Sequence, residues 1–249
     1  MKRFEISVVK CSINSTLRGE PRSLNQRFRG ILFQADRVNT PPRMVTVLVT
    51  VNGNYLFMAW YGLVCAGLGA VGSMRLDPSG TFSMVARCER TGELGVCVST
   101  AVPAVGAVVP HAELGVAAIA TQATSNVTYG VKGLQLIKLG LSPSSALEAL
   151  LREDEGREVR QVIMIDREGR TAAFTGKETV EWRGHITGRN HATAGNMLVG
   201  RQVIEAMAKV FESAEAPLEE RLMQALEAGQ NAGGDKRGRV SAALLVRKR

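Results

Sequence analysis

The chain has 249 residues, 45% of them hydrophobic and 22% charged, which is enough material for one large domain or two small ones with a substantial core. Its net charge of +8 is concentrated near the start, because residues 1–44 hold nine Lys or Arg against three Asp or Glu and so account for +6. The remainder is close to neutral and has no basic stripe with interleaved aromatic residues. This argues against a nucleic-acid-binding function.

Residues 1–80 differ in composition from the rest and are expected to form an extension rather than a folded domain. Residues 1–44 are a basic arm without a sustained hydrophobic period. Residues 55–72 carry no charge and approach the ~20 apolar residues that span a bilayer as a helix. Two alternatives stay open: residues 55–72 form a membrane or export segment that contacts a membrane, or the extension is unstructured or not native. The protein is accordingly expected in the cytoplasm, or anchored or exported if that segment is real.

From Thr81 the pattern changes to short apolar runs between Gly and Pro breaks, which favours strands. In chain order, strands are predicted over residues 81–88 and 94–100, followed by an extended stretch through Val109 and a strand over 114–122. A helix is then predicted over 129–139. A second helix begins at Pro143, with Ser142 as its N-cap.

The second half repeats this order. A hairpin of residues 160–166 and 171–175 is followed by a helix whose apolar stripe runs from Val203 to Phe211. Pro217 opens a fourth helix, and residues 240–246 form a last strand. Strands, helix pair, strands, helix pair and strand together predict an α+β domain over residues 81–249, with two packed antiparallel sheets and a helix pair on each outer face.

The four cysteines have no metal-ligand spacing. If Cys88 lies opposite Leu94 in the first hairpin, then Cys97 lies opposite Val85, and the two cysteines point to opposite faces of the sheet. They are therefore expected to be free and buried rather than joined in a disulfide.

Several blocks of residues 81–246, in this order and spacing, resemble the Domain of Unknown Function 1028 (DUF1028) family. The resemblance is carried by Thr81–Arg87, Gly92–Val96, Ala104–Pro110, Ala120–Ala123, Asn126, Tyr129–Gly130, Arg160–Val162, Ala173–Gly176, Gly184–His185, Gly195–Leu198, Gly234–Gly238 and Ser241–Val246. The resemblance implies an N-terminal-nucleophile (Ntn) hydrolase-like fold, a four-layer αββα sandwich of two antiparallel sheets. It implies no settled reaction.

Thr81, preceded by Gly80, is the main candidate for chemistry. One interpretation is that a β-branched residue simply fits the start of a strand, where it would bury little. In the other, Thr81 becomes an N-terminus whose α-amino group, with a pKa of about 7.7–8.0, takes the proton from its own hydroxyl and makes it a nucleophile. The second interpretation requires removal of residues 1–80. The Gly80–Thr81 junction resembles a self-cleavage site of proteasome-type precursors.

Asn196 and Asn126 match motifs of the family and could donate hydrogen bonds to a substrate carbonyl, or could cap a helix or stabilise a turn. Gly195–Asn196 is predicted as a loop before a helix, whose free N–H groups would suit an oxyanion. The loop at Asp235–Arg237 is either an exposed turn or an anion-binding rim. His185 is expected to be a structural residue.

Two functions from different classes follow. The first is an Ntn-type amidohydrolase with Thr81 as nucleophile and Asn196 and Asn126 as catalytic partners, acting on amide or peptide-like bonds. Cell-wall peptides are suggested because some family members carry peptidoglycan-binding domains. The alternative is a non-catalytic Ntn-fold protein that binds or scaffolds. A small-molecule or peptide-like ligand is expected, with no cofactor, metal or nucleic acid, and a homo-oligomer stays open.

Overall fold

The computed structural model describes residues 49–51, 54–56 and 80–248. The strands β1 (Val49–Val51) and β2 (Asn54–Leu56) form a two-stranded antiparallel sheet. The remaining strands are β3 (Thr81–Arg87), β4 (Leu94–Thr100), β5 (Pro110–Glu113), β6 (Ala117–Ala123), β7 (Arg160–Asp166), β8 (Thr171–Thr175), β9 (Gly184–Gly188), β10 (His191–Asn196) and β11 (Ser241–Arg247). The helices are α1 (Thr128–Lys138), α2 (Pro143–Glu153), α3 (Gln202–Ser213) and α4 (Leu218–Asn231), with short 3₁₀ turns at Val105–Ala107 and Arg157–Val159.

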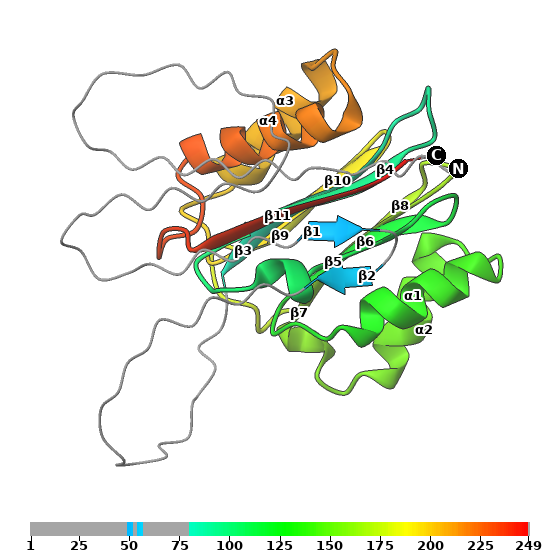
Figure 1. The fold of residues 1–249 in the computed structure, drawn as a ribbon. Coiled ribbons are helices and arrows are strands. Elements are labelled where there is room, and N and C mark those ends of the chain that lie inside the picture. Colours follow the sequence, from blue (N-terminus) through cyan, green and yellow to red (C-terminus); the bar gives the residue numbers. More distant parts are fainter. Residues whose placement is uncertain (1–48, 52–53, 57–79, 249) are drawn as a thin grey trace.

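The strands after residue 80 form two antiparallel sheets. A five-stranded sheet has the order β11-β4-β3-β10-β9, and a four-stranded sheet has the order β5-β6-β7-β8. Figure 1 shows the two sheets between two helix pairs, with α3 and α4 beside the first sheet and α1 and α2 beside the second. The predicted α+β fold of two antiparallel sheets and four helices is therefore confirmed.

Successive side chains along a strand point to opposite faces of the sheet, so one strand contributes to two separate apolar layers. Val85 on β3 faces the other sheet and packs in an apolar layer with Val98 and Ile163. The neighbouring residues Met84 and Ala86 face the helices. Among the described residues, the apolar clusters of both helix layers and of the sheet interface lie within residues 82–246, so this segment has a core of its own and is expected to fold without the extension.

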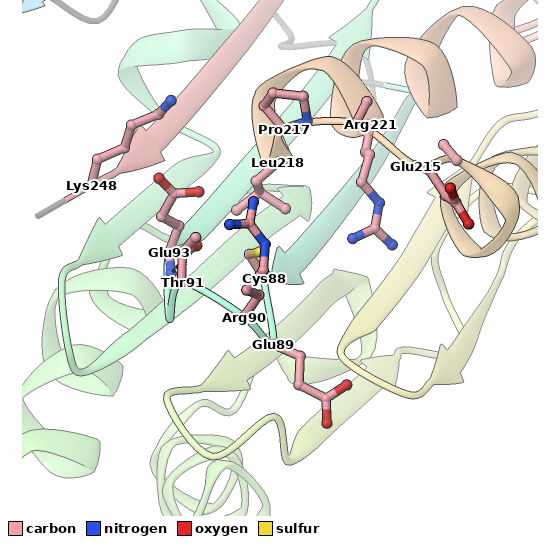
Figure 2. A pocket seen from close by; sticks show the side chains of 12 residues that line it. Cys88, Glu89, Arg90, Thr91, Glu93, Glu215, Pro217, Leu218, Arg221 and Lys248 are labelled. Atoms are coloured by element: carbon pink, nitrogen blue, oxygen red, sulfur yellow. Dashed lines mark hydrogen bonds between the residues drawn. The ribbon is translucent and has the colours of Figure 1, made fainter.

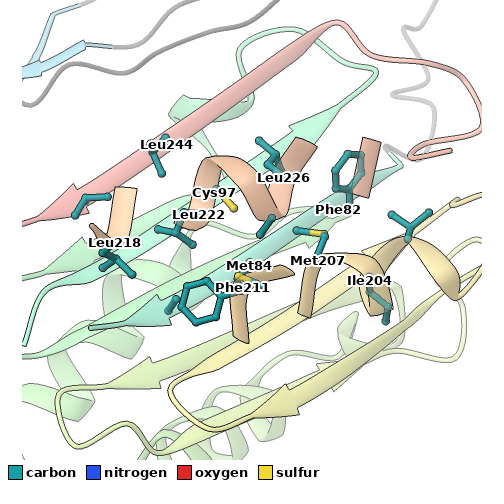
Figure 3. Packing of buried hydrophobic residues seen from close by; sticks show 14 of the residues in the cluster. Phe82, Met84, Cys97, Ile204, Met207, Phe211, Leu218, Leu222, Leu226 and Leu244 are labelled. Atoms are coloured by element: carbon teal, nitrogen blue, oxygen red, sulfur yellow. The ribbon is translucent and has the colours of Figure 1, made fainter. Parts of the chain in front are cut away.

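The helix layer over the five-stranded sheet brings together side chains far apart in sequence. Figure 3 shows Phe82, Met84 and Cys97 from the sheet against Ile204, Met207 and Phe211 from α3 and Leu218, Leu222 and Leu226 from α4. All of these side chains are buried. Those of the helices share one face because they recur at intervals of three and four residues. Arg221 closes one end, where its guanidinium lies 4.0 Å from the centre of the Phe211 ring.

The structure corrects three predictions. The stretch through Val109 is a 3₁₀ turn and loop rather than extended chain, and the hairpin of β9 and β10 was missed. In the β3–β4 pair, Arg87 and not Cys88 lies opposite Leu94, which places Cys97 opposite Met84. Cys88 and Cys97 therefore both contact the helix-facing cluster, although both are free as expected.

Residues 1–44, the proposed basic arm, lie outside the described residues, as do residues 57–72 of the predicted apolar segment. The first two residues of the predicted apolar segment, Tyr55 and Leu56, belong to a strand and not to a helix. Within the ranges that the structure describes, no helix has the combined length and apolarity needed to cross a membrane.

Candidate functional site

A cluster of polar side chains replaces the apolar layer at one end of the sheet interface. Thr81 and Asn196 lie directly opposite each other on β3 and β10, and Thr100 lies opposite Thr81 on β4. Gln122 of β6 and Gln161 of β7 face them from the other sheet. All five are at most 2% exposed, and we call them the polar cluster.

Thr81 is the first residue of the central strand of its sheet. It is 2% exposed, so the expectation that it buries little is wrong. Its hydroxyl donates to the hydroxyl of Thr100 at 3.2 Å, and the Thr100 hydroxyl donates to the backbone carbonyl of Gly80 at 2.5 Å. The Thr81 side chain therefore lies next to the group that binds the carbonyl of the preceding residue.

Arg237 is a second donor to the Gly80 carbonyl, at 3.0 Å from Nη2. Its guanidinium is fixed by Asp235, whose Oδ2 accepts from Nη2 at 2.8 Å and whose Oδ1 accepts from Nε at 3.2 Å. The Asp235 side chain is fully buried and also accepts from the backbone N–H of Ala101. Thus the Asp235–Arg237 loop is more than an exposed turn, because it brings a positive charge to the carbonyl before Thr81.

Gln161 holds the two sheets together at the polar cluster. Its Oε1 accepts from Gln122 Nε2 at 2.8 Å and from Asn196 Nδ2 at 3.0 Å. Its Nε2 lies within hydrogen-bond distance of the Gly195 carbonyl at 2.9 Å, the Gly184 carbonyl at 3.1 Å and Thr175 Oγ1 at 3.0 Å. Gln122 Nε2 also reaches the Thr81 carbonyl at 3.5 Å, while Gln122 Oε1 has no partner among the described residues.

Asn196 lies in the cluster, but not in the predicted loop. It is the last residue of β10, and α3 begins only at Gln202. The backbone N–H groups of Met197 and Leu198 donate to the carbonyls of Val180 and Trp182, so they are not free to bind an oxyanion. The predicted oxyanion site on this segment is therefore wrong, whereas the predicted proximity of Asn196 to Thr81 agrees with the strand register.

The polar cluster is flanked by backbone in the left-handed region. Met197, which follows Asn196, has φ 56°, and Ala123, which follows Gln122, has φ 66°. Non-glycine residues in this region carry strain of about 1–3 kcal/mol and are concentrated at functional sites. Two of the three strands that bring amide side chains to the cluster thus have a strained residue at their end, as in β6, or directly after it, as in β10.

Asn126 has a local role at the start of α1. Its Oδ1 accepts from the backbone N–H of Thr128 at 3.0 Å, and its backbone carbonyl accepts from the Thr121 hydroxyl at 3.1 Å. These are the contacts of a turn-stabilising asparagine.

His185 on β9 lies at the outer end of the network. Its Nδ1 is 2.8 Å from Thr175 Oγ1, and that oxygen also accepts a hydrogen bond from Gln161 Nε2. Partial desolvation lowers the pKa of His185, so the neutral ring is favoured. Within the part of the chain that the structure describes, no group of three His, Cys, Asp or Glu side chains is arranged to hold a metal.

Sequence reasoning missed Thr100, Gln122 and Gln161, and it singled out Arg237 only as part of a loop that is either an exposed turn or an anion-binding rim. Gln122 and Gln161 lie in blocks that carry the family resemblance, but the sequence pattern predicts them only as parts of strands. The missed signal is a glutamine inside an apolar strand, because a buried amide needs partners that only another polar group at the same depth can supply.

A separate cavity of about 620 Å³ opens near the other end of β3. Figure 2 shows side chains from the turn after β3, among them Cys88 and Arg90, together with Pro217 and Arg221 from the start of α4. Burial raises the pKa of the Cys88 thiol, but hydrogen bonds from the Thr91 side chain and from the backbone of Thr91 and Arg90 outweigh it and leave the pKa below its ordinary value. Because Cys88 follows the last residue of β3 and Thr81 is the first, this cavity is not part of the polar cluster.

A family model and one solved structure indicate the same family. The model of the family of unknown function DUF1028 matches residues 81–249. A crystal structure of a DUF1028 protein from Silicibacter pomeroyi matches with 34% sequence identity and a TM-score of 0.65, covering 68% of this chain and 74% of that chain. The ancestral β-subunit Anbu from Yersinia bercovieri, at 6% identity, covers 67% of this chain and 80% of its own with a TM-score of 0.33, which is too low to support an argument. No curated protein matches the sequence significantly. From residue 81 onward, the chain belongs to the DUF1028 family.

Proposed function

We propose that the protein is an Ntn-type amidohydrolase in which Thr81, once freed as an N-terminus, attacks an amide or peptide-like bond. The observation that carries this proposal is the position of Thr81: it begins the central strand, and its hydroxyl lies inside a buried polar cluster at the end of the sheet interface. A threonine that served only to fit a strand would not need four other polar residues around it, each at most 2% exposed.

The free α-amino group of Thr81 would serve as the base. With a pKa near 7.7–8.0 it is partly neutral at pH 7.5 and takes the hydroxyl proton as Oγ attacks. Gln122 Oε1, buried and without a partner among the described residues, is an acceptor available to an amine or to a substrate N–H. Asn196, held by Gln161, stands opposite Thr81 and is the stronger of the two asparagine candidates.

Cleavage of the Gly80–Thr81 bond is part of this proposal, because an acylated nitrogen cannot act as a base. The first test is to express the full chain, incubate it and follow the intact mass and the N-terminal sequence. A mature chain that begins at Thr81 supports the amidohydrolase. A chain that stays uncut in cells and after purification favours the alternative, a non-catalytic protein that binds a ligand through the same fold.

Activity is tested on the chain with Thr81 as its first residue, released from an N-terminal fusion by a protease that leaves no extra residue. Short peptides and cell-wall-type peptide amides are the first substrates. Hydrolysis that disappears in Thr81→Ala and persists at a reduced rate in Thr81→Ser supports the proposal, since serine retains the hydroxyl. Equal hydrolysis by Thr81→Ala contradicts it.

A further inference from the structure

The carbonyl of Gly80 has an unusual environment for a peptide group that precedes a strand. It accepts from the Thr100 hydroxyl at 2.5 Å and from the Arg237 guanidinium at 3.0 Å. Thr100 is fully buried, and Arg237 is held by the buried carboxylate of Asp235. Hydrogen bonds from a charged donor are roughly twice as strong as neutral ones, so this carbonyl is strongly polarised.

The same carbonyl belongs to the peptide bond whose nitrogen is that of Thr81. It is therefore the acyl group nearest to the Thr81 hydroxyl along the chain, and the hydroxyl already contacts Thr100. Two fixed donors on an acyl oxygen beside a nucleophile are the arrangement that stabilises negative charge developing on that oxygen. Residue 80 thus lies where the acyl part of a substrate would lie.

The space around Gly80 also restricts the acyl group. A Cβ atom placed on Gly80 would come within 2.7 Å of Asp235 Oδ2 and 2.7 Å of Met197 Cβ. Asp235 cannot move readily, because its carboxylate is tied to Arg237 and to the backbone of Ala101 and Arg237. Asp235, which positions Arg237, is therefore also one of the two walls that exclude a side chain.

We infer that Thr100 and Arg237 form the acyl-oxygen subsite of the protein, and that this subsite selects acyl groups whose α-carbon bears no side chain, such as an N-acylglycyl group. The inference rests on the proposed function and names its substrate class. Asn196, which lies opposite Thr81 on β10, would face the remainder of the substrate.

The reaction follows ordinary acyl transfer. Thr81 Oγ forms a bond to the acyl carbon while its proton passes to the α-amino group, and the negative charge that develops on the acyl oxygen is bound by Thr100 and Arg237. The carbon–nitrogen bond then breaks, and the leaving amine takes that proton. Water attacks the resulting Thr81 ester and releases the N-acylglycine carboxylate and the free hydroxyl, so no oxidant, reductant or further reactant is needed.

The test compares N-acetylglycine p-nitroanilide with N-acetyl-L-alanine p-nitroanilide on the chain that begins at Thr81. We expect kcat/KM at least ten times higher for the glycyl amide. Arg237→Gln and Thr100→Val should each lower kcat for it by about 100-fold with little change in KM, as removal of one oxyanion donor does. Lys236→Gln, which removes the same charge from the same loop, and Thr193→Val, the same change at another buried strand position, are the matched controls.

Met197→Gly provides a second variant that does not weaken the acyl-oxygen donors. It removes one of the two walls, and glycine adopts φ 56° without strain. The Met197→Gly variant should therefore reduce the ratio of kcat/KM for the glycyl amide to kcat/KM for the alanyl amide. Circular dichroism and thermal melting confirm that each variant is folded.

The outcomes separate this inference from the proposed function. Equal hydrolysis of both amides, or hydrolysis unaffected by Arg237→Gln and Thr100→Val, overturns the subsite while Thr81 stays the nucleophile. Hydrolysis of neither amide, with no ester formed on Thr81, overturns both. A glycyl preference that both donor variants weaken, and that the controls leave intact, supports the inference.

Discussion

Thr81 and Thr100 face each other across β3 and β4 with their hydroxyl oxygens 3.2 Å apart. The Thr100 hydroxyl accepts a hydrogen bond from the Thr81 hydroxyl. It donates its own hydrogen to the carbonyl oxygen of Gly80, the acyl oxygen of the peptide bond before Thr81. A single side chain thus connects the candidate nucleophile with the group it would attack. This connection exists only because the strand register aligns residue 81 with residue 100.

Gln161→Leu should lower the free energy of unfolding by about 3 kcal/mol. The change removes the acceptor of Gln122 and Asn196 and the donor to two backbone carbonyls, and each buried polar group left without a partner costs about 1–3 kcal/mol. Urea unfolding measures the loss. Gln135→Leu on the exposed face of α1 is the matched control and should change stability by less than about 0.5 kcal/mol.

Thr193→Val should stabilise the protein by about 1 kcal/mol. Thr193 is fully buried on β10, and its hydroxyl has no hydrogen-bond partner among the described residues, so valine of the same shape removes a desolvated polar atom. Thr121→Val is the opposite case, because that hydroxyl donates to the Asn126 carbonyl, and it should destabilise by a similar amount. Stabilisation by both variants would show that the Thr121 hydrogen bond contributes nothing.

His191→Leu should reduce the loss of stability between pH 7.5 and 5.5. Burial lowers the pKa of His191 below its ordinary value of 6.5, and although Glu212 raises that pKa, Arg221 acts in the opposite direction. As the pH falls through 6.5, the unfolded chain binds a proton that the native state does not, and the free energy of unfolding decreases. The variant lacks this titration. The pKa values of His111 and His185 are also lowered, so the slope should shrink rather than vanish; an unchanged slope would contradict the assignment.

Asn126→Ala and Asn196→Ala should differ in their effects on activity. Loss of the Asn126 contact to the Thr128 N–H should cost about 0.5–1.5 kcal/mol of stability, the net contribution of one hydrogen bond, with kcat nearly unchanged. Asn196→Ala removes a side chain opposite Thr81 and should lower kcat at least tenfold. A larger kcat loss for Asn126→Ala would reverse the ranking of the two asparagines.

The sequence supports prediction of helices better than prediction of the later strands. Ser142 caps α2 through the Ser145 N–H, with Pro143 in the first turn, as its local sequence predicts. By contrast, β9 and β10 contain glycines and alternating small residues, and they become strands by pairing with each other and with β3, which no local pattern encodes. The predicted register of β3 and β4 was wrong by one residue for a related reason. The true register is fixed by hydrogen bonds within the turn of residues 88–93.

The candidate site could be predicted only in part. Thr81 was recognisable from its place at the start of an apolar run after glycine, and Asn196 from the family motif. The Asp235–Arg237 loop was recognisable only as an exposed turn or an anion-binding rim. The contacts of Thr100 and Arg237 with Gly80 were not predictable, because they join residues 20 and 157 positions apart in the chain. A threonine at the end of a strand and an arginine in a glycine-rich loop are common features, and only their convergence on one carbonyl makes them a site.

The central claim is that Thr81 is the nucleophile, and acyl-enzyme trapping tests it most directly. The chain that begins at Thr81 is mixed with N-acetylglycine p-nitrophenyl ester, quenched in acid within the first turnovers, digested and analysed by peptide mass. If Thr81 is the nucleophile, one acyl group is expected on the N-terminal peptide, on the Thr81 hydroxyl, and none in Thr81→Ala. An acyl group on another residue at the same level in both chains, or no acyl group at all, would contradict it.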